Sequence, residues 1–397
     1  MKKTIFLSLL LWGCSTPEFG VPTTELKSRY PRVSTTENGG LLMSWFEKID
    51  SVNWALQWSE FDKGNWSEGQ TITKGKPYFV NWADFPSIYE VGEDNLVAHW
   101  LQKSGKGPYD YNVQISRSND RGKSWSESVI PHGDIDPKGE HGFLSFFHQK
   151  DESLGFVWLD GRHMGAYDPV THSMGDMALM RSTMMVNGEM GAETMLDSRV
   201  CECCPTSSIH TENSLIIAYR DRSEKEIRNI NIIRYADGEW FDPYPVHEDN
   251  WLIGGCPVNG PMLAANGTDL AIAWYTSPNE SPTVNVAFSH NEGASFELPI
   301  RVDLSKPIGR VDLIWISETE VMVSWIETAE ETTDIVTAIV STTGEVQSPR
   351  IVTEIQPGRV SGYPQMERVN DQLFFAWTEG GESGSVKTKW VALSAFR

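Results

Sequence analysis

The chain has 397 residues and carries 33 Lys and Arg against 54 Asp and Glu, which gives a formal net charge of −21 at pH 7. The acidic excess is spread along the sequence and no run of Lys or Arg occurs, which excludes nucleic acid as a partner held by a basic surface. The length suffices to bury a large core, and the 16 Trp residues indicate a core built from repeated aromatic side chains.

The first residues have the pattern of an export signal. Lys2 and Lys3 precede an apolar stretch over residues 5–12 that is too short to span a bilayer. The following residues end in L-W-G-C and resemble a bacterial lipobox, whose cysteine here is Cys14. We therefore expect residues 1–13 to be removed as a signal peptide and the Cys14 thiol to be lipidated.

Cleavage before Cys14 leaves a tether over residues 14–20 and a single domain over residues 21–397. Lipidation predicts a location in the bacterial cell envelope, on the periplasmic or the surface side of the outer membrane. An ordinary secretory signal is the alternative, and it also predicts export. We expect a monomer that contacts the membrane only through its N-terminal anchor.

A short apolar run that ends in Trp or Tyr recurs seven times after this leader, at intervals of about 50 to 60 residues. Each run follows a polar turn and is nearly continuous in apolar residues, which is typical of a strand buried on both faces. The runs cover residues 41–45, 96–100, 154–158, 215–219, 270–274, 321–325 and 373–377.

Each run is the second of four strands in its unit. A shorter strand precedes it, often opened by proline as at Tyr30-Pro31, and a third strand and a turn follow it. A fourth strand follows in every unit except the last, and residues 21–27 are the candidates that complete that unit. The sequence therefore predicts an all-β fold, a β-propeller of seven four-stranded antiparallel blades, with six blades as the alternative.

Residues 118–125 (S-N-D-R-G-K-S-W) predict a tight turn between the third and fourth strands of the second unit. Gly122 can adopt the positive φ that such a turn requires, and Asp120 can accept backbone N–H groups within it. Residues 289–296 (S-H-N-E-G-A-S-F) repeat the pattern with Asn291 in place of the acid, and residues 59–66 are a weaker copy. The spacing resembles the Asp box of sialidases and related β-propellers.

Chain direction alternates along an antiparallel meander, so the first strand of a unit begins and the second strand ends on the same face of the ring. First strands are innermost, so their first residues lie near the axis on this face, opposite to the turn at residues 118–125. We expect the ligand concavity there because titratable residues gather at these positions. They are Asp84, His141, Arg310 and Tyr363 at the first strands, and Asp160, Arg162, Arg220, Asp221, Arg222, Glu327 and Glu379 at the second strands.

The cysteines other than Cys14 enter the same face from two neighbouring connections; they are Cys201, Cys203, Cys204 and Cys256. In an exported protein the first interpretation is disulfides, including one that links the run to Cys256. A thiolate metal site, with or without His141 or His210, is the second interpretation. A redox role or free thiols are the third.

Eight of the 13 Met lie between Met164 and Met195, alongside His172. Exported segments rich in Met and His can bind copper through the soft thioether sulfur. We favour core packing for these residues, because Met commonly fills gaps between strands. No metal and no cofactor is therefore predicted for the site.

From residue 21 onward the chain resembles the bacterial sialidase-like propellers with Asp boxes, and among them an exo-sialidase-like lipoprotein subgroup. The motifs that carry the resemblance are L-D-G-R at residues 159–162, C-x-C-C-P-T at 201–206, Y-R-D-R at 219–222, G-C-P-V-N-G-P at 255–261 and G-R-V-D at 309–312. The R-I-P motif of the family is absent.

This resemblance implies a glycan or glycoconjugate as the ligand. It implies a clamp around a substrate carboxylate that consists of Arg162, Arg310 and either Arg220 or Arg222. It also implies Tyr363 as the nucleophile, Glu327 or Glu379 as its base, and Asp84 as the acid/base. The remaining substrate-binding candidates on this face are Asp160, Asp221 and His141.

Three functions remain open on the sequence alone. The first is a glycoside hydrolase of the exo-sialidase type that acts on acidic sugars, and the second is a non-catalytic surface propeller that binds a glycan or protein partner. The third is a metal or redox protein centred on the cysteines. Arginines that are each bonded to their own carboxylate would favour the second function, and four sulfurs around one point would favour the third.

Overall fold

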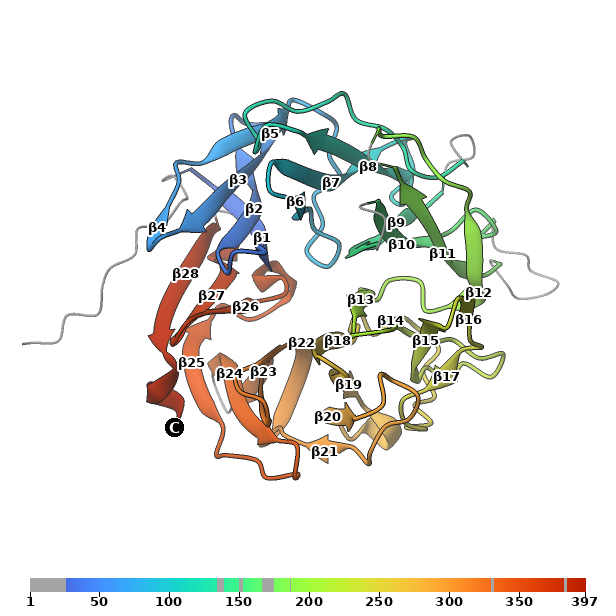
Figure 1. The fold of residues 1–397 in the computed structure, drawn as a ribbon, viewed down its shortest axis with the longest axis vertical. Helices are drawn as coiled ribbons and strands as arrows, with labels where there is room; N and C mark the ends of the chain where they lie inside the picture. The colour runs from blue at the N-terminus through green and yellow to red at the C-terminus, as the bar shows by residue number, and fades with distance from the viewer. Residues whose placement is uncertain are drawn as a thin grey trace, which may run out of the picture.

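Seven antiparallel sheets are arranged as blades around a central axis, and the chain passes through them in order (Figure 1). The computed structural model describes residues 26–133, 139–149, 153–165, 175–185, 187–329, 332–381 and 384–397. The prediction of an all-β propeller with seven antiparallel blades is confirmed. Residues 1–25 with Cys14, and residues 166–174 with His172, lie outside the described residues.

Blade 1 contains β1 (Ser28–Thr35), β2 (Leu41–Lys48), β3 (Trp54–Asp62), β4 (Asn65–Trp66) and β5 (Gln70–Lys74). Blade 2 contains β6 (Ser87–Gly92), β7 (Asn95–Lys103) and β8 (Tyr111–Ser118). Blade 3 contains β9 (His141–His148), β10 (Leu154–Asp160), β11 (Met177–Met184) and β12 (Thr194–Val200). Blade 4 contains β13 (Ser207–His210), β14 (Leu215–Arg220), β15 (Ile230–Ala236), β16 (Glu239–Trp240) and β17 (Tyr244–Pro245). Blade 5 contains β18 (Met262–Asn266), β19 (Asp269–Thr276), β20 (Thr283–Ser289) and β21 (Ile300–Arg301). Blade 6 contains β22 (Lys306–Trp315), β23 (Glu320–Ala329), β24 (Thr332–Ser341) and β25 (Arg350–Ile355). Blade 7 contains β26 (Gln365–Val369), β27 (Gln372–Glu379) and β28 (Ser385–Ala392). The helical turns are η1 (Pro278–Glu280), η2 (Arg359–Ser361) and η4 (Leu393–Phe396).

The seven apolar runs are the second strands of the seven blades, as predicted, and their final aromatic residues are only 0–6% exposed. Burial on both faces explains why these strands lack a polar alternation. A buried aromatic side chain removes about 150–250 Å² from water, which contributes roughly 4–6 kcal/mol before the entropy cost of ordering. One such aromatic in each blade therefore makes a large part of the driving force for folding.

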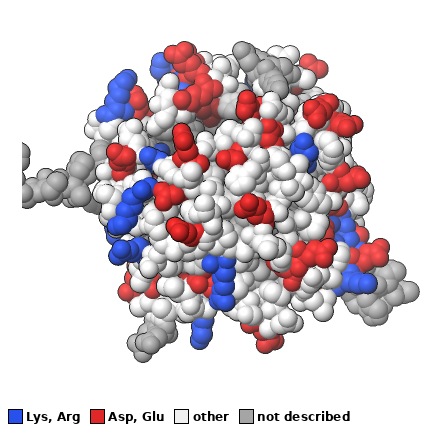
Figure 2. Space-filling model, turned by 60° about the horizontal axis from the view of Figure 1, so that its bottom comes forward, with Lys and Arg blue, Asp and Glu red and all other residues white. Residues whose placement is uncertain are grey.

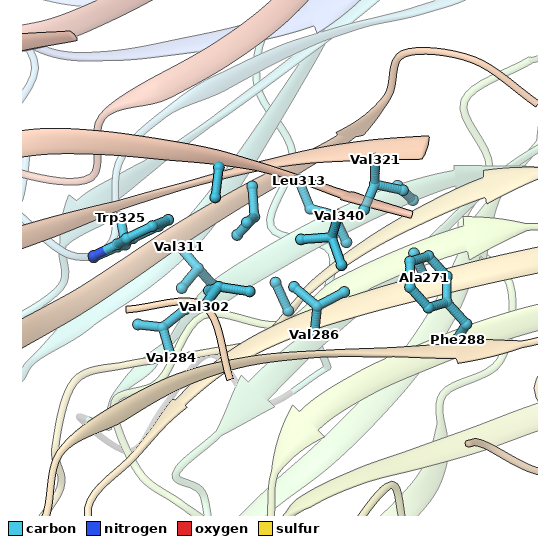
Figure 3. Close-up of a cluster of buried hydrophobic side chains, with 14 of the residues drawn as sticks. Ala271, Val284, Val286, Phe288, Val302, Val311, Leu313, Val321, Trp325 and Val340 are labelled. Atoms are coloured by element: carbon cyan, nitrogen blue, oxygen red, sulfur yellow. The ribbon is translucent and has the colours of Figure 1, made fainter. Parts of the chain in front are cut away.

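Neighbouring blades pack through layers of aliphatic side chains. Figure 3 shows the layer between blades 5 and 6, where Val284 and Val286 of β20 face Val311 and Leu313 of β22, with Trp325 of β23 at one end. The valines come from strands, in which β-branched side chains are favoured because they pack well on a pleated surface.

Among the described residues, blades 1 and 4 have five strands each, blades 2 and 7 have three each, and the ring closes between β1 and blade 7. In blade 2 the described residues form three strands, and a single antiparallel bridge between Ile115 and Val129 marks the position of the expected fourth strand. Blade 7 also has three strands, and β1 lies beside β27 (Figure 1). Ser28 N–H donates to the Gly384 carbonyl at 3.1 Å, which joins the two ends of the ring. Of the residues proposed to complete blade 7, 21–25 lie outside the described residues, and 26–27 form no strand.

Acidic side chains outnumber basic ones on the face that Figure 2 presents. Figure 2 shows Asp and Glu scattered over the face that it presents, with fewer Lys and Arg between them. This distribution agrees with a solvated surface. Among the described residues, no helix has the length and apolar character needed to cross a membrane.

Candidate functional site

The first strands of all seven blades line a cavity of about 510 Å³ along the axis. First strands are therefore innermost, as the sequence rule requires. The ionisable side chains that line it include Arg32, Glu37, Asp84, Glu90, His99, His148, His210, Asp312 and Glu367.

Three carboxyl groups of this cavity have raised pKa values. Burial raises the pKa of Asp312 to about 6, against the opposing charge of Arg32. Burial and the neighbouring Asp312 raise the pKa of Glu367 to about 8. Burial also raises the pKa of Asp84 well above its usual value, and the charge of Glu140 adds to that shift. Carboxyl groups of this kind can hold a proton near neutral pH and donate it.

Asp84, Tyr111 and Glu140 form a compact group between blades 2 and 3, which we call the carboxyl–tyrosine group. The Tyr111 hydroxyl donates to Glu140 Oε1 at 2.5 Å. Gly142 lies between the side chains of Asp84 and Tyr111, since a Cβ at residue 142 would be 2.0 Å from Asp84 Oδ2 and 3.2 Å from the Tyr111 ring. Only glycine at this position leaves room for the Asp84 carboxyl beside the ring.

The electrostatics of this group suit acid–base chemistry. Burial raises the pKa of Glu140 to about 7, and the charge of Glu202 adds to the shift although the Tyr111 hydrogen bond opposes it. Burial, Glu140 and Asp84 together raise the pKa of Tyr111. A phenol that donates to a carboxylate with a pKa near neutrality can pass its proton to that carboxylate, and the raised pKa of Tyr111 adds to the cost of this transfer. A second carboxyl beside them, Asp84, can act as the proton donor.

Neither Tyr111 nor Glu140 was among the predicted site residues. Glu140 directly precedes His141, which the first-strand rule selected, so the rule would have found Glu140 had it included the residue before the strand. Tyr111 opens a third strand, for which the rule made no prediction. Its contact with Glu140 arises because the start of β8 pairs with that residue across the blade boundary.

Asp84 also belongs to a structural device that recurs around the ring. Tyr30, Phe143 and Arg310 have φ values of 54°, 55° and 57° in β1, β9 and β22, and the strand register shifts at each of them. The N–H of each donates to a side-chain oxygen supplied by the preceding blade. We call these three contacts the interblade bonds; their acceptors are Thr378 Oγ1 at 2.8 Å, Asp84 Oδ2 at 2.8 Å and Asn259 Oδ1 at 2.7 Å.

The arginines proposed as a carboxylate clamp all have partners within the protein. Arg162 pairs with Asp160 at 2.6 Å and with Glu193 at 2.8 Å. Arg222 pairs with two other acids, Glu202 at 2.6 Å and Glu226 at 2.7 Å.

The other two arginines are buried and bind mainly backbone carbonyls. Arg220 donates to the carbonyls of Asn259, Arg228 and Tyr275 at 2.6–2.9 Å. Arg310 donates to the Gly358 and Gly362 carbonyls and to Ser361 Oγ at 2.9–3.2 Å. Each of the four guanidinium groups thus ties together neighbouring segments of the chain.

Tyr363, the predicted nucleophile, is buried and its hydroxyl donates to the Val258 carbonyl at 2.6 Å. Its ring stacks on Trp82 with centroids 6.2 Å apart. Burial raises its pKa, and the charged groups that influence it are the Cys204 thiol, Arg310 and Arg220. No contact joins it to either predicted base within the described residues.

Three predicted acids accept a hydrogen bond from the tryptophan two residues earlier. The indole N–H of Trp158 donates to Asp160 at 2.7 Å, that of Trp325 to Glu327 at 2.7 Å, and that of Trp377 to Glu379 at 3.1 Å. The Glu327 and Glu379 carboxylates also accept backbone N–H groups: Ser305 donates to Glu327 and Gln356 donates to Glu379. The W-x-[DE] pattern thus stabilises the end of a second strand, and it was visible in the sequence.

The two remaining candidates have other partners. His141 is buried, stacks on His132 with ring centroids 4.0 Å apart, and lies 3.6 Å from Asp160. Burial, with repulsion from Asp197, raises the pKa of Asp221 to about 6.

A disulfide joins Cys203 to Cys256, and two free thiols, Cys201 and Cys204, are buried beside it. The Sγ atoms of Cys201 and Cys204 are 3.4 Å apart, and they lie 3.3 and 3.7 Å from Cys256 Sγ. Among the described residues, the potential metal ligands that converge here are these three cysteines, without His141 or His210.

The turn at residues 118–125 lies at the other end of the blade. Arg121 N–H donates to the Asp94 carbonyl in the turn between β6 and β7, whereas Asp84 precedes β6. Ser124 N–H and Ser118 Oγ–H both donate to Asp120 Oδ1, at 2.9 and 2.8 Å. Residues 289–296 make the same pair of bonds to Asn291 Oδ1. These turns are therefore structural.

Comparison with solved structures finds the same fold in glycan-processing proteins. A Hadza microbial sialidase matches at a TM-score of 0.53 and 14% identity, over 94% of this chain and 66% of that one, so this chain spans less than two thirds of its length. A polysaccharide lyase described as an ulvan lyase matches at a TM-score of 0.57 and 10% identity, over 90% of this chain and 91% of that one. An α-L-arabinofuranosidase from Fusarium graminearum matches at 0.50 and 14%, over 94% and 96%.

At such low identity these similarities establish the propeller fold alone. No protein-family model matches the sequence, and a search of curated proteins finds no match.

Proposed function

We propose that this protein is a glycan-active propeller that binds its ligand in the axial cavity and cleaves a glycosidic bond with the carboxyl–tyrosine group. The observation that carries the proposal is the hydrogen bond of Tyr111 to Glu140 with Asp84 beside them, and of these three residues Asp84 lines the cavity. Propellers that process sialosides, arabinosides and ulvan support the ligand class, since they share the fold.

In this mechanism Glu140 accepts the phenol proton as Tyr111 attacks the anomeric carbon. Asp84, kept protonated by its buried position, gives its proton to the leaving oxygen. Water then attacks the tyrosyl-linked sugar while Asp84 acts as the base, and the proton on Glu140 returns to Tyr111. Asp84 thus acts first as the acid and then as the base, whereas Glu140 exchanges its proton with Tyr111 alone.

The internal pairing of the arginines favours a neutral glycan over an acidic sugar. Arg162 and Arg222 are already neutralised by carboxylates, and Arg220 and Arg310 hold backbone carbonyls. A substrate carboxylate would therefore have to displace an existing partner. The acidic surface also repels anions that approach within about 8 Å, the screening length at physiological salt.

The same pairing supports a second candidate function, a propeller that binds a glycan or protein partner without cleaving it. The two candidates differ in what the carboxyl–tyrosine group does. If the protein binds its partner without cleaving it, the residues of the carboxyl–tyrosine group only stabilise the fold, and no product is formed.

A glycan array and a hydrolysis screen with neutral glycans, sialosides and ulvan oligosaccharides test both candidates. We expect wild type to bind and cleave one class, and Asp84→Asn and Tyr111→Phe to keep binding but lose about 10²–10⁴-fold of the turnover. Glu327→Gln is the matched control, because its carboxyl binds Trp325 instead. Binding without turnover in wild type selects the second candidate. A folded wild type that neither binds nor cleaves any glycan contradicts the first candidate and restricts the second to a protein partner.

The proposal includes export and lipid anchoring through Cys14. The lipobox-like L-W-G-C supports it, and labelling of cells with a radioactive fatty acid tests it. We expect label in the wild-type protein in the cell envelope and none in Cys14→Ser. Wild-type protein that remains unlabelled and cytoplasmic would contradict this part.

A further inference from the structure

We propose that Cys201, Cys204 and Cys256 form a thiolate site for a soft metal ion, Zn²⁺ or Cu⁺, that opens when a dithiol reduces the Cys203–Cys256 disulfide. This site is independent of the glycan chemistry proposed above. It brings together the connection between β12 and β13, which carries Cys201 and Cys204, and the connection between β17 and β18, which carries Cys256.

The spacing of the sulfurs fits a metal with little movement. The three Sγ–Sγ distances are 3.3, 3.4 and 3.7 Å. A tetrahedral zinc with Zn–S bonds of about 2.3 Å requires sulfurs about 3.8 Å apart. An outward shift of a few tenths of an ångström therefore makes room for the ion. Soft thiolate ligands select zinc and monovalent copper over harder cations.

Two of the three sulfurs accept a hydrogen bond from a nitrogen donor. Arg228 donates to Cys201 Sγ at 3.0 Å, and the Asn259 N–H donates to Cys204 Sγ at 3.3 Å. Donors of this kind stabilise a thiolate, which is the form that binds a metal.

A buried arginine supplies the charge that a thiolate site needs. Arg220 is only 1% exposed, and the bonds it makes within the described residues go to carbonyl oxygens and to no carboxylate. Buried charges require a partner of opposite sign. Three thiolates on Zn²⁺ carry a net charge of −1, which Arg220 balances. Arg228, by contrast, is already paired with Glu202 and Glu226.

The disulfide controls access, because Cys256 cannot bind a metal as a thiolate while it is bonded to Cys203. A dithiol breaks this bond: it gives two electrons and two protons, becomes a disulfide itself, and leaves Cys203 and Cys256 as thiols. Metal binding then releases the protons of the three ligand thiols. Cys203 and Cys256 are partly exposed whereas Cys201 and Cys204 are buried, so a reductant meets the disulfide first.

Two probes test the proposal in the full-length protein under anaerobic conditions. Zn²⁺ affinity is measured by competition with a chromophoric chelator, and Co²⁺ reports sulfur ligation through its thiolate charge-transfer absorption. We expect protein reduced with dithiothreitol to bind one ion with thiolate absorption, roughly 100-fold more tightly than oxidised protein. The same affinity before and after reduction, or binding without that absorption, would overturn the proposal.

Two variants separate the role of a metal-binding cysteine from the role of the disulfide. Cys204→Ser should weaken binding roughly 100-fold, with thermal unfolding recorded to confirm that it folds. Cys203→Ser removes the disulfide but keeps all three ligands, so it should bind the ion without any reductant. If Cys203→Ser binds no metal, or if Cys201 and Cys204 join in a disulfide in that variant instead, the proposal is wrong. Should that variant fail to fold, metal binding by reduced wild-type protein still decides between the two outcomes.

Discussion

Substitution of Asp84 separates its structural role from its proposed chemical role. Its Oδ2 accepts the N–H of Phe143, a buried residue held at a φ of 55°. Asn259 makes the equivalent interblade bond to Arg310 with an amide oxygen at 2.7 Å. The chain itself therefore shows that asparagine satisfies this bond, and Asp84→Asn should preserve the fold where Asp84→Ala does not.

The expected magnitudes follow from the contact. Asp84→Ala leaves a buried N–H without its acceptor, which costs about 1–3 kcal/mol of the free energy of unfolding. The Asn variant keeps the acceptor and should lie within about 0.5 kcal/mol of wild type at pH 4.

The two variants also differ in their response to pH. Burial raises the pKa of Asp84 in the folded protein, whereas aspartate titrates near 4 in an unfolded chain. The folded state thus binds this proton more tightly, and wild type loses stability as the pH rises above about 4. Asp84→Asn has no such proton to lose, so it should become more stable than wild type at pH 8.

Urea denaturation at pH 4 and pH 8 measures this, with the fluorescence of the 16 Trp as the signal. Turnover of the glycan identified in the screen is measured on the same samples. The interblade-bond reasoning is refuted if Asp84→Asn loses as much stability as Asp84→Ala at pH 4. A gap between Asp84→Asn and wild type that does not grow with pH would refute the assignment of a raised pKa.

Three further predictions concern residues that we place in the fold. Glu327→Ala should lower the free energy of unfolding by about 2–4 kcal/mol, because it leaves the Trp325 indole and the Ser305 N–H without an acceptor, and glycan turnover per folded molecule should not change. Arg220→Met should cost about 3–5 kcal/mol, since three buried carbonyls lose their donor; thermal and urea unfolding measure it. Bonds from Ser124 lower the pKa of Asp120 to about 2, so the stability it adds is present above about pH 4 and disappears toward pH 2; Asp120→Asn should lack this dependence in denaturation followed from pH 5 to pH 2.

Each of these has a result that would contradict it. A Glu327→Ala protein with normal stability but reduced turnover would restore Glu327 as a catalytic base. Normal stability of Arg220→Met would remove the structural role given to that guanidinium. An Asp120→Asn protein that follows the wild-type acid response would show that the turn does not depend on the charge of residue 120.

The sequence alone predicted the blades because their signal is local. A strand covered on both sides must be apolar at successive positions, so each second strand is a continuous run ending in an aromatic residue, and seven runs indicate seven blades. The direction of the strands then predicted which end of each blade carries the titratable residues. The turn at residues 118–125 lies at the opposite end of its blade from Asp84, and among the predicted site residues Asp84 lines the axial cavity.

The partners of the polar groups were decided by the tertiary structure. The sequence motifs of Arg162 and Arg222 resemble those of arginines that bind a substrate carboxylate. In the structure, however, each of the two pairs with a carboxylate from another loop. Glu140 gained its significance only because the start of β8 lies beside it, and the sulfurs of Cys201 and Cys256 meet although 55 residues separate them. Burial of a strand is set by the strand's own residues, whereas a hydrogen bond, an ion pair or a metal site requires two segments to be placed within about 4 Å of each other. Only the closing of the ring places them.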